Sequence, residues 1–144
     1  VLEDEEHARA RGATIHALVT GYGNTCDAAH MSKPDRDGQV RAMRMALAEA
    51  EVRPSTVGYV NAHGSSTPLN DSTETLAIRQ VFGEHAERLA ISGTKGYYGH
   101  ALGASGAIEA AICAGGRATR PDYVLSNSFG FGGINAALVL RRAD

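Results

Sequence analysis

The feature that most constrains the fold of this chain is a regular alternation of strand-like and helix-like segments. Runs of β-branched and apolar residues predict strands over 13–23, 57–62, 89–92, 123–127 and 135–141. Between them, the spacing of apolar residues predicts helices over 38–51, 75–82 and 104–114. The order β-α-β-α-β-α-β-β is typical of an α/β fold, with a mainly parallel, mixed sheet and helices packed on it.

Residues at the ends of these segments fit the same pattern. Asp37 is expected to cap the first helix, and Asp71 with Glu74 forms an acidic version of the capping box before the second. Gly83 suits the end of that second helix, and the strand at 89–92 is expected to be buried. The last two strands flank a Gly-rich turn and are expected to form a hairpin at an antiparallel edge of the sheet.

The composition fits one globular domain of modest size. Of the 144 residues, 43% are apolar and 21% are charged, so disorder is not expected. The formal net charge is -2 and there is no basic block, which argues against nucleic acid as a partner. The chain starts at Val1 rather than at Met, and Val1–Leu2 is typical of the tail of a strand. We therefore expect a fragment of a longer protein.

Cysteine usage and hydropathy bear on the compartment. Cys26 and Cys113 lie far apart without a CxxC partner, so both are expected to be reduced thiols in a cytosol-like compartment. No apolar run reaches the 18 residues that would predict a membrane span. The charged start is unlike a signal peptide, and a cytoplasmic location (or an organelle stroma or matrix) is expected.

Three loops that follow predicted strands carry the candidate chemistry. His63 lies in NAHGSSTPLND, Lys95 and His100 lie in GTKGYYGH, and the third loop is SNSFGFGGIN at 126–135. Loops that leave the carboxyl edge of an α/β sheet are where such proteins build active sites. Two imidazoles and an ammonium group from different loops predict a site that stabilises negative charge developing on a carbonyl.

Each of these residues also has a plainer interpretation. His63 could bond a neighbouring carbonyl, His100 could be a buried and satisfied histidine, and Lys95 could be solvated. His100 precedes a helix, whose N-terminus favours a neutral imidazole that can donate a hydrogen bond. Glu109 lies on an otherwise apolar helix, so either it faces solvent or it is buried with a partner, for which Lys95 is the best candidate.

The third loop suggests an oxyanion hole. Glycines around Phe129 and Phe131 let backbone N–H groups point into a site, although an ordinary Gly-rich hairpin would look the same. No GxGxxG or GxxxxGK[ST] segment follows a strand, so nucleotide binding is not predicted. The sequence has no HExxH motif and no Cys/His cluster that predicts a metal, and nothing beside Cys26 marks it as a nucleophile.

Together and in this order, these segments resemble the C-terminal half of β-ketoacyl-acyl-carrier-protein synthases. Those enzymes are the decarboxylating condensing enzymes of fatty-acid synthesis, with a thiolase-like fold. The resemblance runs from VLEDEEHARARGA through GYGNTCDAAHM to NSFGFGGINAALVL. It is to the elongating, type II-like members, because the initiating member has Asn in place of the second active-site loop's histidine. The resemblance implies that residues 1–144 form the C-terminal thiolase-like domain, and that the N-terminal half with the nucleophilic cysteine lies outside them.

The resemblance also implies roles for the catalytic candidates. His63 and His100 match the two histidines of the family's Cys-His-His triad, which hold the malonyl thioester carbonyl while CO2 leaves. Lys95 matches the family's active-site lysine, and Glu109 matches its buried acidic partner.

Substrate-binding roles and partners follow in the same way. Ser65 and Thr67 match hydroxyls that contact the phosphopantetheine arm, with Ser65 in place of the commoner Thr. Phe131 matches the gating phenylalanine whose N–H also serves the oxyanion hole, and Phe129 lies beside it. The implied partners are acyl carrier protein, acyl and malonyl thioesters, and a second copy in a homodimer. The implied chemistry needs no cofactor beyond the phosphopantetheine on the carrier protein.

The sequence departs from the family pattern in three places. Neither Cys26 nor Cys113 stands in the context of the triad cysteine. Tyr97 and Tyr98 stand where the family more often has smaller residues, and the connection over 116–121 is shorter than the family's. The fragment alone is therefore expected to be inactive.

Three other functions remain open from the sequence. One is a polyketide ketosynthase with the same chemistry, and another is a non-catalytic partner subunit like the chain-length factors. The third is a ligand-binding α/β domain, which would expose a large apolar face. The presence of His63, His100 and Lys95 favours an enzyme.

Overall fold

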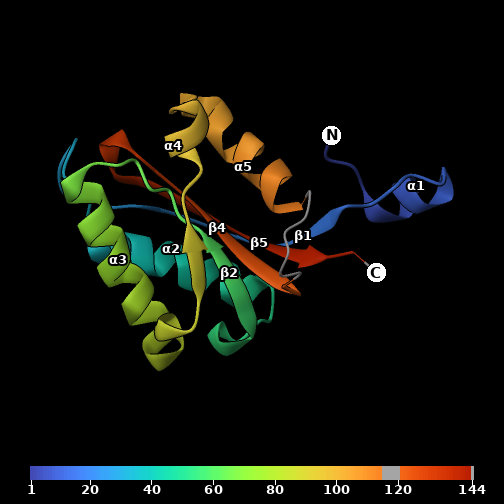
Figure 1. Cartoon of the computed structure of the whole chain (residues 1–144), viewed down its shortest axis with the longest axis horizontal. Helices are drawn as coiled ribbons and strands as arrows, with labels where there is room; N and C mark the ends of the chain where they lie inside the picture. Colours follow the sequence, from blue (N-terminus) through green and yellow to red (C-terminus); the bar gives the residue numbers. More distant parts are fainter. Residues whose placement is uncertain (115–120, 144) are drawn as a thin grey trace.

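The computed structural model describes residues 1–114 and 121–143 (Figure 1). Within them, one five-stranded sheet has the order β1-β5-β4-β2-β3. Its strands are β1 (Ala17–Cys26), β2 (Val57–Asn61), β3 (Ala90–Ser92), β4 (Tyr123–Gly130) and β5 (Ile134–Arg142). The α-helices are α1 (Glu5–Ala10), α2 (Arg36–Glu49), α3 (Pro68–Phe82), α4 (Lys95–Tyr98) and α5 (Ser105–Ala114). Short 3-10 turns lie at Pro54–Thr56, Gly83–Glu87, Leu102–Ala104 and Phe131–Gly133.

Helices cover both faces of the sheet. Val57, Leu125 and Val139 belong to the larger core, which α2 and α3 complete on one face. On the opposite face, Tyr59, Val124 and Leu140 pack against α5. Neighbouring residues of β4 and of β5 thus enter different cores, as the alternation of side chains in a strand requires. In β2, Val57 and Tyr59 are two positions apart and still enter different cores, because the pairing with β4 shifts register between them. Figure 1 shows α5 on the other side of the strands from α2.

Glycines let α2 lie directly against β1. A Cβ on Gly23 would stand 2.0 Å from the carbonyl oxygen of Ala42, and one on Gly21 would stand 2.1 Å from that of Ala46. Both distances are far inside van der Waals contact, so these two positions cannot carry a side chain while α2 stays in place.

The predicted α/β order is confirmed, but the predicted arrangement of the sheet is partly wrong. The β4–β5 hairpin exists and is antiparallel. It does not form the edge, because β5 also pairs with β1 along its length and thereby lies inside the sheet. Among the described residues, two strand pairs are parallel (β2–β3 and β2–β4) and two are antiparallel, so the sheet is evenly mixed rather than mainly parallel. The order of pairing depends on contacts distant in sequence, which local patterns do not encode.

The first strand and first helix are shifted from their predicted positions. β1 begins at Ala17, not at residue 13, and continues to Cys26 because its last residues pair with β5. The N-cap of α2 is Asp35, whose Oδ1 accepts the Gly38 N–H at 2.9 Å. The prediction that Asp37 caps this helix is therefore wrong.

The second helix starts earlier than predicted. Thr67 caps α3, and its side chain accepts the N–H of Asn70. Asp71 and Glu74 thus lie inside the helix, and the capping box assigned to them is wrong. The end at Gly83 is confirmed, with a φ of 56° that favours glycine.

Other predictions have mixed outcomes. β3 was expected to be buried, but it is an edge strand and Ile91 is 44% exposed. Val1–Leu2 lies outside any strand, and α1 and α4 were not predicted. The helix over 104–114 is confirmed as α5. The short connection predicted over 116–121 falls largely on residues 115–120, outside the described residues.

Two further observations concern the thiols and membranes. Neither Cys26 nor Cys113 is in a disulfide in the described part of the chain. None of the helices in the described residues is long and apolar enough to cross a membrane.

Candidate active site

His63 lies two residues beyond β2 and is held by its backbone. Its N–H donates to Oε1 of Glu74 at 2.9 Å, and its carbonyl accepts from Nζ of Lys95 at 2.6 Å. The residue is 7% exposed. Burial, followed by the positive charges of Lys95 and His100, lowers the pKa of His63 to about 4. The imidazole is therefore neutral near pH 7.

His100 faces His63 from the loop after α4. The two ring centroids are 5.5 Å apart, with the planes at 72°. The Leu102 N–H donates to Nδ1 of His100 at 3.1 Å, and Oγ of Ser105 lies 3.1 Å from the same nitrogen. Because Nδ1 accepts, a neutral His100 carries its proton on Nε2 and can donate from there. This orientation leaves Nε2 as the nitrogen that can donate to a ligand.

Lys95 and Glu109 form the buried pair that the sequence predicted. Nζ of Lys95 lies 2.5 Å from Oε1 of Glu109, and the two side chains are 4% and 0% exposed. Thr94 also donates to that carboxylate oxygen, at 3.3 Å. A buried ion pair stays charged only when both partners are present, so Glu109 keeps an ammonium group beside the histidines.

The Gly-rich turn after β4 contributes two phenylalanines in different settings. Phe129 is 7% exposed, and its ring centroid lies 6.0 Å from that of His63. Phe131 is 83% exposed. The structure thus brings Phe129 to the histidines and leaves the Phe131 side chain at the surface.

Hydrogen bonds tie this turn to the loop after β1. Nδ2 of Asn135 donates to Oδ1 of Asp27 at 2.6 Å, and the Asp27 N–H donates to the Gly133 carbonyl at 2.8 Å. The Gly132 N–H donates to the Met31 carbonyl at 2.7 Å. Sequence reasoning did not identify this link, because its two halves lie about a hundred residues apart.

Ser65 and Thr67 lie next to one another at the start of α3. Their hydroxyl oxygens are 2.9 Å apart. Ser65 is half-buried and Thr67 is exposed. Both residues follow His63 in the segment between β2 and α3. Thr67 is at the same time the N-cap of α3.

Glu74 is the residue that sequence reasoning assigned wrongly and that the structure places at the site. Its carboxylate accepts the N–H groups of His63 and Gly64, and the side-chain amides of Asn127 and Asn70. Burial raises the pKa of Glu74, and these hydrogen bonds oppose that effect. Four donors converging on one buried carboxylate fix the position of the His63 backbone.

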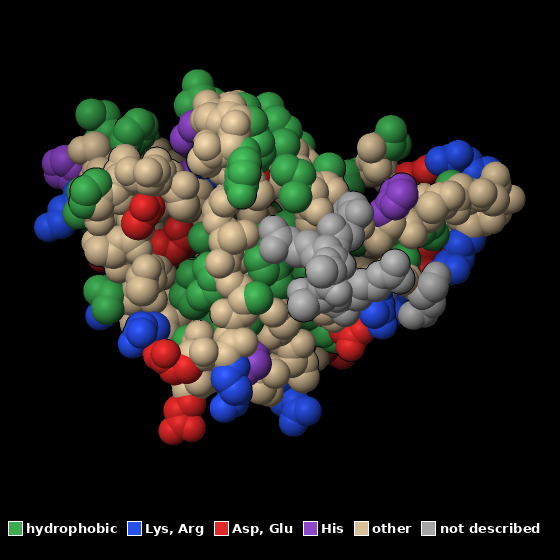
Figure 2. Space-filling model, in the orientation of Figure 1, with side chains coloured by type: hydrophobic (Ala, Val, Ile, Leu, Met, Phe, Trp, Pro, Cys, Tyr) green, Lys and Arg blue, Asp and Glu red, His purple; other side chains and the backbone are tan. Residues whose placement is uncertain are grey.

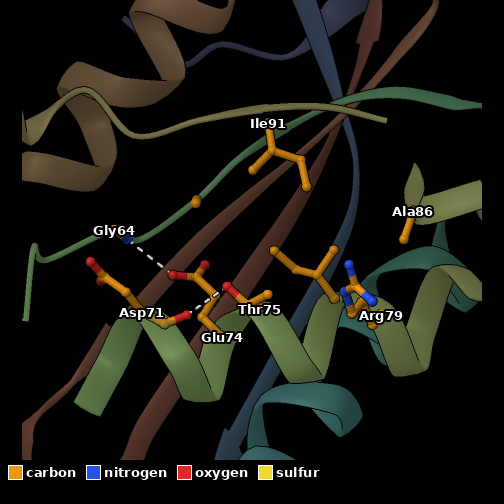
Figure 3. Close-up of a pocket in the computed structure, with 9 residues that line it drawn as sticks. Gly64, Asp71, Glu74, Thr75, Arg79, Ala86 and Ile91 are labelled. Atoms are coloured by element: carbon orange, nitrogen blue, oxygen red, sulfur yellow. Dashed lines mark hydrogen bonds between the residues drawn. The ribbon is translucent and has the colours of Figure 1, made fainter. Parts of the chain in front are cut away.

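Gly64 and Glu74 also line a pocket of about 240 Å³ (Figure 3). Asp71, Thr75 and Arg79 line it from α3, and Ile91 lines it from β3. None of the four candidate catalytic side chains belongs to the lining residues identified in the described part of the chain. The two histidines therefore do not line this pocket.

The surface over α4 and α5 is rich in exposed apolar side chains. Figure 2 shows hydrophobic atoms gathered over α4 and α5. The large exposed side chains in and beside these two helices are those of Tyr97, Tyr98, Leu102, Ile108 and Ile112. A patch of this kind marks an interaction surface, as expected for part of a larger fold.

The described residues contain no group of three or more His, Cys, Asp and Glu side chains that could hold a metal ion. Cys26 is exposed, and its Sγ lies 3.6 Å from the Gly132 carbonyl oxygen. Cys113 is half-buried and packs against the small core under α5.

The fold and the paired histidines define an α/β protein with the architecture of the C-terminal half of the thiolase-like fold. A crystal structure of a β-ketoacyl synthase from Burkholderia phymatum matches with a TM-score of 0.92 and 40% identity, over 99% of this chain and 41% of that one. A ketosynthase bound to a hexaketide, in complex with a type II polyketide acyl-carrier protein, matches with a TM-score of 0.93 and 35% identity. That match covers 99% of this chain and 42% of the other.

Sequence comparison gives the family. A family profile described as the C-terminal domain of β-ketoacyl synthases matches residues 16–115. The 3-oxoacyl-[acyl-carrier-protein] synthase 2 of Coxiella burnetii is 41% identical, over 99% of this chain and 42% of its own length. The chain therefore belongs to the β-ketoacyl synthase family, and it spans about two fifths of the length of that relative.

The alignment with this relative is longer than the chain itself. It extends over 172 positions, 28 more than the 144 residues of this chain. The relative therefore has residues within the aligned region that this chain lacks.

Proposed function

We propose that this chain supplies the carbonyl-binding half of a decarboxylating 3-oxoacyl-acyl-carrier-protein synthase. The main support is the pair of imidazoles 5.5 Å apart beside a buried Lys–Glu pair, in a chain of this family. Neutral imidazoles can donate to a thioester carbonyl without adding a formal charge to the site.

In this proposal, His63 and His100 donate to the carbonyl oxygen of a malonyl thioester. The bond between the malonyl methylene carbon and its carboxylate breaks, CO2 leaves, and the electron pair moves onto the thioester as an enolate. Donors aimed at the enolate oxygen stabilise the charge that develops there, which is commonly the largest contribution to such catalysis. The enolate carbon then attacks the acyl thioester on the enzyme, and the enzyme's thiolate leaves.

Lys95 acts through His63 rather than on the thioester. Its ammonium group binds the His63 carbonyl, and its charge helps to keep the imidazole neutral. Glu109 holds that ammonium group in place. The acyl-bearing thiol is proposed to come from outside these 144 residues, because neither Cys26 nor Cys113 lies in a setting that activates a thiol.

The substrate arm and the partners are part of the same proposal. Ser65 and Thr67 are proposed to bind the phosphopantetheine arm, and Phe131 to gate the site while its backbone N–H serves the oxyanion hole. Acyl carrier protein delivers the thioesters, and no further cofactor takes part. We expect a homodimer in the cytoplasm or in an organelle stroma or matrix.

A polyketide ketosynthase is the second candidate, since one similar structure is a ketosynthase of that class. A partner subunit of the chain-length-factor type is not favoured, because this chain keeps His63, His100 and Lys95, to which the proposal assigns the decarboxylation. The discriminating experiment offers malonyl-acyl-carrier-protein and an acyl donor to the full-length protein and identifies products by mass spectrometry. One 3-oxoacyl product per condensation supports the fatty-acid enzyme, and repeated extension without reduction supports the polyketide enzyme. No condensation with an intact fold would contradict both.

A further inference from the structure

Tyr98 ends α4, and its side chain folds back to the residue that precedes the helix. The hydroxyl oxygens of Tyr98 and Thr94 lie 2.6 Å apart. A helix of four residues is too short to be stable by itself, so side-chain and tertiary contacts must hold it. The Tyr98–Thr94 contact joins the two ends of α4.

The direction of this hydrogen bond follows from counting protons. Thr94 has one hydroxyl proton, and it donates that proton to Oε1 of Glu109 at 3.3 Å. The carboxylate, paired with Lys95, has no proton to return. Thr94 must therefore accept from Tyr98, and the phenol O–H is the donor.

This bond extends the network of the catalytic candidates to the surface. Tyr98 donates to Thr94, Thr94 donates to Glu109, and Lys95 bonds both Glu109 and the carbonyl of His63. A donor that is itself polarised by a second donor makes a stronger hydrogen bond. The partly exposed phenol, with the residue 39% exposed, thus strengthens a contact on a carboxylate that is fully buried.

α4 also sets the spacing between Lys95 and His100. Lys95 is its first residue, and His100 follows its last residue by two positions. Figure 1 shows α4 lying beside α5, which carries Glu109. Closing α4 on itself therefore fixes both the ammonium group and the second imidazole.

We propose that Tyr98 is a positioning residue. Its hydroxyl bonds Thr94 and joins the two ends of α4, and this link, which we call the clasp, holds Lys95 and His100 in place relative to His63. The catalytic consequence rests on the proposed condensing function, whereas the clasp itself does not. Tyr97 provides the matched control, because it is the adjacent tyrosine of the same helix and is 93% exposed.

The test compares Tyr98→Phe with Tyr97→Phe in the full-length protein. The first readout is amide hydrogen exchange at Tyr97 and Gly99, whose N–H groups close α4 on the carbonyls of Thr94 and Lys95. Loss of one hydrogen bond should speed this exchange about three- to ten-fold in Tyr98→Phe, and Tyr97→Phe should leave the Gly99 rate unchanged. Unchanged exchange in Tyr98→Phe would overturn the clasp.

The second readout is steady-state condensation with malonyl-acyl-carrier-protein. In Tyr98→Phe, kcat should fall about three- to ten-fold while KM stays within about two-fold, because the clasp positions reacting groups and does not bind the carrier. Thr94→Ser should keep both values, since it retains the hydroxyl, and Thr94→Val should lower kcat at least as far as Tyr98→Phe. Faster exchange with an unchanged kcat would overturn the positioning role. If the unsubstituted protein makes no product, the proposed function fails, and the exchange rates still decide whether the clasp exists.

Discussion

Acid should destabilise this protein through His63. The pKa of the buried imidazole is lowered from 6.5 to about 4, so between these pH values the unfolded chain takes up a proton that the folded chain excludes. Stability from this group is complete above about pH 6.5 and is lost as the pH falls to about 4. One pKa unit corresponds to about 1.36 kcal/mol, so the full loss is about 3 kcal/mol, and about 2 kcal/mol of it should appear by pH 5.

The assay is urea unfolding of the full-length protein at pH 7, 6 and 5, beside the variant His63→Gln. The variant cannot titrate at this position, so its free energy of unfolding should fall about 2 kcal/mol less over the same range. Glu74, whose pKa is raised, acts in the opposite direction, because acid relieves its buried charge. That effect is present in both proteins and cancels in the comparison. Parallel pH profiles for the two proteins would refute a neutral, desolvated His63.

Three further predictions concern buried polar groups. Lys95→Met or Glu109→Gln alone leaves one buried group without its charged partner. Each substitution should lower the free energy of unfolding, measured with urea, by about 3–5 kcal/mol. The double variant should cost clearly less than the sum, and simple additivity would contradict a direct pair. Glu74→Gln places a side-chain N–H group against backbone N–H donors, so it should lower the free energy of unfolding by about 1.5–3 kcal/mol. It should also shift the amide NMR signals of His63 and Gly64, and unmoved signals would contradict the hydrogen bonds described for Glu74. Gln39 is fully buried, and among the described residues neither polar atom of its amide has a hydrogen-bond partner. Gln39→Met should therefore raise the free energy of unfolding by about 1–3 kcal/mol, and a lower free energy of unfolding than that of the unsubstituted protein would contradict this account.

Local sequence patterns predicted the elements better than their pairing. The helix of α5 and the stop at Gly83 follow from residues close to one another in the chain. The place of β5 between β4 and β1 depends on pairing with a strand more than a hundred residues away. α4 escaped prediction because four residues show no helical period.

For the candidate site too, local sequence patterns identified some residues correctly and missed the role of another. His63, Lys95 and His100 were identified because they lie in Gly-rich loops after strands, and the Lys95–Glu109 pair followed from a carboxylate on an apolar helix. Glu74 was taken for a capping residue. Its carboxylate instead accepts the backbone N–H groups of His63 and Gly64, which lie in the loop before α3. Capping patterns signal acceptors only for backbone amides within the same turn, whereas the amides of His63 and Gly64 lie ten or more residues before Glu74.

The most direct test of the central claim is the release of labelled CO2 from malonyl-acyl-carrier-protein by the full-length protein. The account predicts steady release by the unsubstituted protein and a fall of about a hundred-fold or more in His63→Ala and in His100→Ala, since each removes a donor to the developing enolate. Glu84→Gln, which changes an exposed side chain in the 3-10 turn after α3, should release CO2 at the unsubstituted rate. Release that persists in both histidine variants would contradict the claim that these two imidazoles carry the decarboxylation.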